Sequence, residues 1–338
     1  MNAGPEIVEN CTSIFNARGK DALERTRAEM LASAIDRGIL SSALKYFAKV
    51  TLRNALPVFP ALMSLSCQAV GGKIEKTTGT SVALMLYAGA ADIHDDIIDK
   101  SNYKYLKKTV FGKFGSSVAL LTGDALLIQG TNLLHKECET LPEEERQRIL
   151  NVTTAAFFQI SKAEVKEIGL RGKLKIAPRE YLETIKLKAS VPKVNCEIGA
   201  ILGKGNEDEN HKLAEYGRTF GILSLIVEEF ADLLDPKEFE SRMRNECPPL
   251  PFLYAASNPT VRNGTLQLFP REGFSQVNLE KVAETVLKSP EVKSLARRLQ
   301  RKVFRQIREL SFIENRKIEE ELATLLLAQL YSLRCSVH

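Results

Sequence analysis

Four aspartates share one face of a short segment in the first third of the chain. They are Asp92, Asp95, Asp96 and Asp99, spaced i, i+3, i+4 and i+7, which puts them on neighbouring turns of a helix. The preceding residues 77–91 are uncharged, and this pattern predicts a helix buried within a larger bundle. Carboxylates crowded at the C-terminal end of a helix repel one another and oppose its dipole. We therefore expect a hard divalent cation such as Mg²⁺, which binds carboxylates together with substrate phosphates.

A second acidic cluster lies far along the chain. It consists of Glu228, Glu229 and Asp232, with Asp235 one turn later, and it follows the largely apolar residues 220–227. A single acid-rich turn is usually a solvated helix end. Two such clusters, each at the end of an apolar helix, favour metal ions held inside a helical bundle, because buried carboxylates need partners.

Helical periodicity dominates the rest of the sequence. With 338 residues, 44% hydrophobic and 26% charged, the chain has the composition of an ordinary globular protein. Apolar residues recur at helical spacing, and no strand alternation is evident. The spacing predicts helices over 24–47, 57–70, 77–91, 117–138, 145–167, 179–202, 209–234, 279–313 and 317–335. We expect an all-α fold in a single domain, residues 1–338, with the proline-rich segment 236–276 as its least regular part.

The charge balance and the cysteines restrict the possible partners and compartment. Lys and Arg number 47 and Asp and Glu 42, a net charge of +5. This excess is small and dispersed, and the chain has no Trp, so we expect no nucleic-acid partner. The longest uncharged run, residues 54–72, contains prolines and polar side chains, so it predicts a buried helix and no transmembrane segment. The chain begins without a signal-peptide pattern, and its six cysteines are scattered, which predicts a cytoplasmic protein with reduced thiols.

The acidic clusters and the sequence around them resemble the trans-isoprenyl diphosphate synthases, the polyprenyl synthetase family. The run Asp95-Asp96-Ile97-Ile98-Asp99 resembles the first aspartate-rich motif of the family, and Glu228-Glu229-x-x-Asp232 lies where the second should be. Further similar segments are Gly123-Asp124-Ala125-Leu126-Leu127, Lys186-Leu187-Lys188-Ala189-Ser190 and Pro249-Leu250-Pro251-Phe252-Leu253. The resemblance covers about residues 45–256, and the C-terminal helices, 279–335, lie beyond it.

The resemblance implies a fold and a reaction. The family is a single large helical bundle of the isoprenoid synthase type, usually a homodimer. Its members join an allylic diphosphate to isopentenyl diphosphate with Mg²⁺. The implied metal ligands are Asp95, Asp96, Asp99, Glu228, Glu229 and Asp232. The implied catalytic residues are Asp95, Asp96 and Lys188; Lys188 also contacts the allylic diphosphate, and Glu164 lies near the cation.

The sequence departs from the family pattern in the pocket for isopentenyl diphosphate. Arg53 matches a family arginine, but Val50 replaces a lysine, and Lys49 is a candidate substitute four residues before Arg53. Lys104 and Tyr105 replace two arginines, so Lys104 keeps a charge for the diphosphate but loses the bidentate guanidinium. Two alternatives therefore stay open. One is an enzyme with another acceptor, or one that cyclises the cation as a terpene synthase does. The other is a low-activity regulatory subunit of a heteromeric synthase.

Small residues before the first motif predict a long product. In the family, bulky side chains four and five residues before the first aspartate of the motif close the floor of the product tunnel. Here these positions hold Ala91 and Ala90, and Tyr87 is the next candidate floor. This pattern favours a product of geranylgeranyl length or longer. The alternative is that Ala90 and Ala91 pack against a neighbouring helix without any cavity.

Overall fold

The computed structural model describes residues 4–33, 37–104, 106–173, 175–267 and 276–337. The chain forms two compact units, each of which is described by itself. Unit 1 comprises Met1–Cys11, Val152–Val194 and His211–His338, and unit 2 comprises Thr12–Asn151 and Asn195–Asn210. The all-α prediction is confirmed, whereas the single domain stays a prediction.

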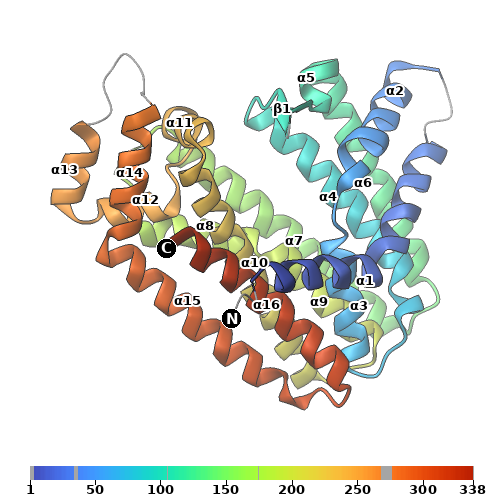
Figure 1. The fold of residues 1–338 in the computed structure, drawn as a ribbon. Helices are drawn as coiled ribbons and strands as arrows, with labels where there is room; N and C mark the ends of the chain where they lie inside the picture. The colour runs from blue at the N-terminus through green and yellow to red at the C-terminus, as the bar shows by residue number, and fades with distance from the viewer. Residues whose placement is uncertain (1–3, 34–36, 105, 174, 268–275, 338) are drawn as a thin grey trace. The chain divides into compact units, whose positions relative to one another are not determined.

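Unit 2 is built around α4 (Thr78–Ile98), which packs along α6 (Ser116–Cys138) (Figure 1). Around this pair lie most of α1 (Gly4–Ser33), α2 (Ile39–Tyr46), α3 (Val58–Ala69) and α5 (Val110–Phe114), with short helices at Phe47–Thr51, Leu52–Asn54 and Ile74–Lys76. Apolar side chains from six segments, including Phe47, Leu86, Ile93 and Leu126, fill one core cluster. The uncharged stretch before the aspartates thus forms a core helix, as predicted.

A small hairpin follows α4. Strand β1 (Tyr103–Lys104) pairs antiparallel with β2 (Lys107–Lys108), and Lys104 lies opposite Lys107. The sequence pattern predicted no strand here, because two-residue strands are too short to show alternation. This hairpin carries Lys104 back towards the end of α4.

Unit 1 contains α8 (Pro178–Lys188) and the C-terminal helices, and α7 (Glu143–Leu170), α9 (Ser190–Leu202) and α10 (Glu207–Leu234) have residues in both units. The predicted helix 279–313 is divided at Ser289 into α14 (Gln276–Lys288) and α15 (Pro290–Arg308), and α16 (Arg316–Val337) ends the chain. Ser289 accepts a hydrogen bond from Val292 N, and Pro290 is the first residue of α15. A serine N-cap followed by proline starts a new helix.

The proline-rich segment is more regular than predicted. It contains α11 (Pro236–Asn245), α12 (Leu250–Ala256) and α13 (Pro259–Gln267). The described prolines of this segment lie in or next to the first turn of each helix, where a missing N–H costs no hydrogen bond. Residues 268–275 of the segment lie outside the described residues. Proline composition indicated irregular structure, but proline position decides the outcome.

One described helix, α6, is long and apolar enough to cross a membrane by length and composition, and 33% of its most apolar window is buried. A core helix passes the same test, and α6 packs along α4. All six cysteines are free, and five of them are buried. This agrees with the prediction of unpaired thiols.

Candidate active site

The first acidic cluster is held at the last two turns of α4. Asp96 is buried at 3% exposure, whereas Asp92, Asp95 and Asp99 are half-buried. The helix ends with Lys100 at φ 55°, and Ser101 N donates to Asp96 O at 2.9 Å. This arrangement is a Schellman motif with a non-glycine residue in the left-handed conformation. It fixes where the helix carrying the aspartates ends.

Lys104 neutralises part of this cluster. Its Nζ lies 2.8 Å from Asp92 Oδ1 and 2.8 Å from Asp96 Oδ1. Desolvation lowers the pKa of Lys104, but the two carboxylates outweigh it and raise the pKa above its ordinary value. Burial raises the pKa of Asp96 to about 6, against the opposing effect of Lys104. The cation expected from the crowding of aspartates is thus partly supplied by the protein itself.

Gly123 and Asp124 on α6 position His94 beside the cluster. A Cβ on Gly123 would lie 2.3 Å from His94 Nε2, so a larger residue at 123 would displace the imidazole. Asp124 Oδ1 lies 3.4 Å from the same nitrogen. The Gly-Asp pair singled out in the sequence therefore has a structural role next to α4.

The donor set suits Mg²⁺ only together with a substrate. Within the described ranges, no group of three or more His, Cys, Asp or Glu side chains is arranged to hold a metal ion by itself. Asp95 and Asp99 lie one turn apart, and Mg²⁺ is commonly bound by one or two carboxylates, with water and phosphate oxygens completing the shell. The residues thus fit an ion that arrives with a diphosphate.

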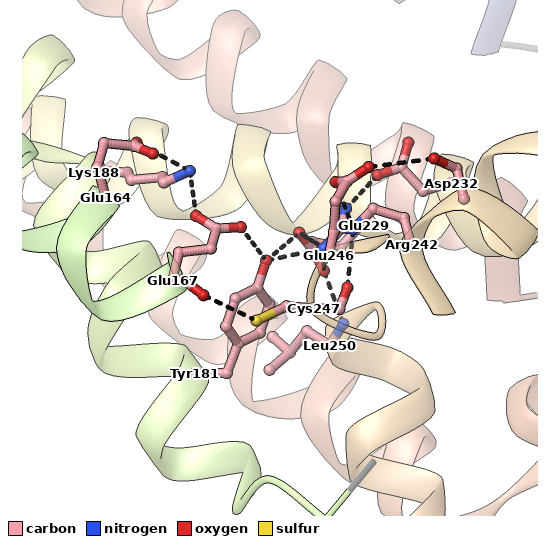
Figure 2. A network of polar contacts seen from close by, with 11 residues as sticks. Glu164, Glu167, Tyr181, Lys188, Glu229, Asp232, Arg242, Glu246, Cys247 and Leu250 are labelled. Atoms are coloured by element: carbon pink, nitrogen blue, oxygen red, sulfur yellow. Dashed lines mark hydrogen bonds and ion pairs between the residues drawn. The ribbon is translucent and has the colours of Figure 1, made fainter. Parts of the chain in front are cut away.

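The second acidic cluster is occupied by an arginine (Figure 2). Arg242 of α11 is buried, and its Nη2 donates to Glu229 Oε1 at 2.9 Å and Oε2 at 3.1 Å, while Nη1 donates to Asp232. Its Nε donates to Cys247 O at 2.9 Å and lies 3.4 Å from Glu246. Desolvation lowers the pKa of this guanidinium, but the surrounding acids outweigh it and raise the pKa well above its ordinary value.

The carboxylates of this cluster therefore differ in availability. Glu229 is 7% exposed and also accepts a hydrogen bond from Leu250 N at 2.7 Å. Glu228 is exposed to solvent. Its pKa is raised, first by partial desolvation and then by the nearby carboxylates Asp232 and Glu229. Asp235 is the N-cap of α11, where it accepts hydrogen bonds from Lys237 N and Glu238 N. Its spacing from Asp232 suggested one acidic face, but α10 ends at Leu234 and Asp235 belongs to the next helix.

Tyr181 connects this cluster with Lys188 (Figure 2). The Tyr181 hydroxyl donates to Glu229 Oε1 at 2.9 Å and accepts from Arg242 Nη2 at 2.9 Å. It lies 3.4 Å from Glu167, which forms an ion pair with Lys188. Lys188 Nζ also lies 3.1 Å from Glu164 Oε1. Burial, and then Glu229, raises the pKa of Tyr181 well above its ordinary value, so this hydroxyl stays protonated.

The remaining predicted residues lie elsewhere in unit 2. Lys49 and Arg53 are exposed on successive short helices. Ala90 is 1% exposed within the core cluster that contains Phe47 and Leu126. Tyr87 and Ala91 are half-buried, and the Tyr87 hydroxyl donates to Thr131 Oγ1 at 3.0 Å. The roles of these residues stay predictions, and Tyr105 lies outside the described residues.

Sequence reasoning missed two central residues, Arg242 and Tyr181. Neither belongs to an acidic motif, and each comes from a different helix from Glu229. The one local signal was the Arg242–Glu246 pair at i, i+4 spacing, which does not point to α10.

Comparison with known proteins agrees with the motif order. The family model described as polyprenyl synthetase matches residues 41–261. The geranylgeranyl diphosphate synthase of Methanosarcina mazei is 29% identical over 189 residues, which are 55% of this chain and 57% of the relative. The matched part thus spans less than two thirds of that relative. Heptaprenyl diphosphate synthase component 2 of Bacillus subtilis is 26% identical over 280 residues, 81% of this chain and 76% of the relative.

The fold is shared with solved structures. The crystal structure of geranylgeranyl pyrophosphate synthetase from Pyrococcus horikoshii superposes with a TM-score of 0.82 at 20% identity, covering 96% of this chain and 99% of that chain. The predicted fold type is thereby confirmed. Because the family model spans more than half of the sequence and includes both acidic clusters, the chain belongs to the polyprenyl synthetase family.

Proposed function

We propose that the protein is a prenyltransferase that elongates an allylic diphosphate with isopentenyl diphosphate, to geranylgeranyl length or longer. The observation that carries the proposal is the aspartate face at the end of α4, where Asp95 and Asp99 lie beside the Lys104-bound Asp96. Four acids maintained at the end of a core helix are costly for a purely structural protein. Membership of the polyprenyl synthetase family supports the same reaction.

Asp95, Asp96 and Asp99 would hold Mg²⁺ in unit 2, and Glu228 would be the most accessible metal ligand in unit 1. Bound Mg²⁺ would stabilise the negative charge that develops on the departing diphosphate. Glu229 and Asp232 were also predicted as metal ligands, and their engagement with Arg242 favours a supporting role, in which they orient the arginine.

In unit 2, Lys104 would provide positive charge to a diphosphate, and Lys49 and Arg53 would contribute to acceptor binding. In unit 1, Lys188 would provide positive charge to a diphosphate. Lys188 is held by Glu164 and Glu167, and Lys104 by Asp92 and Asp96. Each lysine would exchange a carboxylate partner for a phosphate oxygen. The free energy gained by diphosphate binding is therefore smaller than it would be if the lysine had no carboxylate partner beforehand. Contacts of a charged group with a phosphate are worth about 1.5–3 kcal/mol before this exchange.

Two alternative functions rest on the altered acceptor pocket. One is an enzyme that ionises the allylic diphosphate but uses another acceptor or cyclises the cation. The other is a subunit of a heteromeric synthase, which is supported by the similarity to the Bacillus subtilis component 2.

The test is a product assay with labelled isopentenyl diphosphate, Mg²⁺ and, separately, dimethylallyl, geranyl, farnesyl or geranylgeranyl diphosphate. Elongated products that disappear with EDTA and in Asp95→Ala, but persist in Asp21→Ala, are expected; Asp21 is an exposed aspartate on α1. Release of diphosphate without elongation would replace the proposal by the first alternative. Absence of turnover would favour the subunit.

We also propose that the protein is a cytosolic homodimer. Exposed apolar side chains on α6, Leu120, Leu121 and Ile128, are 48%, 59% and 61% exposed. A second copy of the chain would cover such a face, because contiguous exposed apolar side chains commonly mark an interface. The free buried cysteines are consistent with a reducing compartment.

A further inference from the structure

α15 in unit 1 has an apolar side and a cationic side. Val292, Leu295, Leu299 and Val303 are buried along one side. The opposite side carries six exposed cations, here called the cationic face: Lys293, Arg297, Arg298, Arg301, Arg305 and Arg308. Figure 1 shows α15 as a long helix beside α16, in agreement with their packing.

This helix accounts for the whole basic excess of the protein. Its 19 residues include seven Lys or Arg and one acid, Glu291, a net charge of +6. Because the full chain carries +5, the remaining residues together carry −1. The expectation that the excess is dispersed along the chain is therefore wrong, because the structure gathers it on one side of one helix.

Among the described residues, no carboxylate forms an ion pair with any of the six members of the cationic face. By contrast, Arg218 on α10 and Arg244 on α11 each pair with a glutamate of their own helix. Arg298 instead lies over the ring of Tyr254 at 5.4 Å. Like charges at i, i+4 destabilise a helix, so an external anion bound to this face would relieve their repulsion.

Lys302 beside the face supports this view. Desolvation lowers its pKa; Glu215 opposes this effect, and Lys186, Arg218 and Arg305 reinforce it. Lys302 thus lies in a desolvated position close to other cations, although Arg218 and Lys186 pair with Glu215 and Glu183. An open hollow of about 700 Å³ lies among Arg298, Arg301, Lys302, Phe304, Arg305 and Arg308, which is room for a phosphate group.

We propose that the cationic face of α15 binds a surface of anionic phospholipids, with headgroup phosphates as its counter-ions. Phe304, 41% exposed amid the arginines, adds an apolar contact at the depth of the headgroups. The six cations extend from Lys293 to Arg308, about 22 Å along the helix axis, which suits an extended surface. The protein contains no Trp and only 7% aromatic residues, which disfavours a single-stranded nucleic acid that binds by stacking.

The binding should be peripheral and sensitive to salt. The apolar side of α15 is packed within the protein, so the helix has no apolar face to insert into the bilayer. The attraction of the protein to the membrane surface then depends on the cations, and the contributions of the individual Lys and Arg side chains add up. Salt screens such exposed charges, so high ionic strength should release the protein.

The test is co-sedimentation of the full chain with vesicles of phosphatidylcholine, with and without about 30% phosphatidylglycerol, at low and high salt. The charge variant combines Arg297→Gln, Arg301→Gln, Arg305→Gln and Arg308→Gln. The matched control removes four exposed cations on other elements, by Lys45→Gln, Lys73→Gln, Lys136→Gln and Lys281→Gln. The pair Arg297→Gln, Arg301→Gln serves if the fourfold variant does not fold. The assay contains no prenyl substrate, so its outcome is independent of the proposed enzyme activity.

We expect the wild-type protein to bind anionic but not neutral vesicles, and to be released by high salt. The charge variant should bind at least about tenfold more weakly, and the control should bind as the wild type does. Equal binding to both kinds of vesicle, or equal loss in the control, would overturn the proposal. Tighter binding to a short RNA than to anionic vesicles at the same salt, lost in the charge variant, would also overturn it and assign the face to nucleic acid.

Discussion

Replacement of Arg242 by glutamine tests the polar network of the second acidic cluster. The Arg242 side chain is 8% exposed, and its partners Glu229 and Asp232 are 10% and 29% exposed. Glutamine keeps part of the volume and one donor group, but it removes the positive charge. Among the described residues, Glu229 then remains buried with Tyr181 and Leu250 N as its other hydrogen-bond donors.

The expected cost follows from this geometry. Removal of one partner from a buried ion pair costs about 3–5 kcal/mol, because the other charge is left buried and uncompensated. The matched control is Arg244→Gln, two residues away on α11. Its partner Glu240 lies 2.9 Å away, with exposures of 44% and 38%, and an exposed helical pair is worth about 0.3–0.5 kcal/mol. The loss in free energy of unfolding should therefore be severalfold larger for Arg242→Gln than for Arg244→Gln.

Urea unfolding followed by circular dichroism measures the difference, and hydrogen exchange of the α11 amides locates it. The double variant Arg242→Gln, Glu229→Gln should be more stable than the sum of the single effects predicts, because it removes both charges of the pair. If Arg242→Gln and Arg244→Gln shift the unfolding midpoint equally, the network does not hold α11 and the reasoning is refuted.

Three further predictions follow from unit 2. The pKa of Asp96 is raised from 3.8 to about 6, so the folded state binds this proton more tightly than the unfolded chain, and the stability of the protein decreases as pH rises through this range. In EDTA, Asp96→Asn should therefore raise the free energy of unfolding by up to about 3 kcal/mol at neutral pH and leave it unchanged near pH 4. Parallel curves of stability against pH for the two proteins would contradict this prediction. Ala91→Phe and Ala90→Phe should each shorten the prenyl product, and overpacking of the core should also destabilise Ala90→Phe by about 1–3 kcal/mol. Chromatography measures the chain length of the products. An unchanged product distribution in both variants would show that these positions do not control chain length. Ile128→Glu should convert the proposed homodimer to a monomer in light scattering, because it places a charge within the apolar face of α6; an unchanged dimer mass would locate the interface elsewhere.

Much of the fold could be predicted because helical periodicity is local. The uncharged run before Asp92 indicated a core helix, and α4 is one. Boundaries were less predictable where capping competes with periodicity: Ser289 interrupts a continuous helical pattern, and Lys100 ends α4 without a glycine. Within the site, the spacing of Asp95 and Asp99 was sufficient to place both on one face, since residues four apart always lie one turn apart.

The sequence by itself determined the family, the all-α class and the acidic faces, because motifs and periodicity are properties of residues close together in the chain. Only the tertiary structure decided which cations meet those acids. Lys104 reaches Asp96 through a hairpin, and Arg242 reaches Glu229 from a different helix. It also decided that the cationic face of α15 is left without carboxylate partners among the described residues. These pairings depend on which segments pack together, and packing is set by the burial of apolar surfaces along the whole chain, which spacing in one segment does not encode.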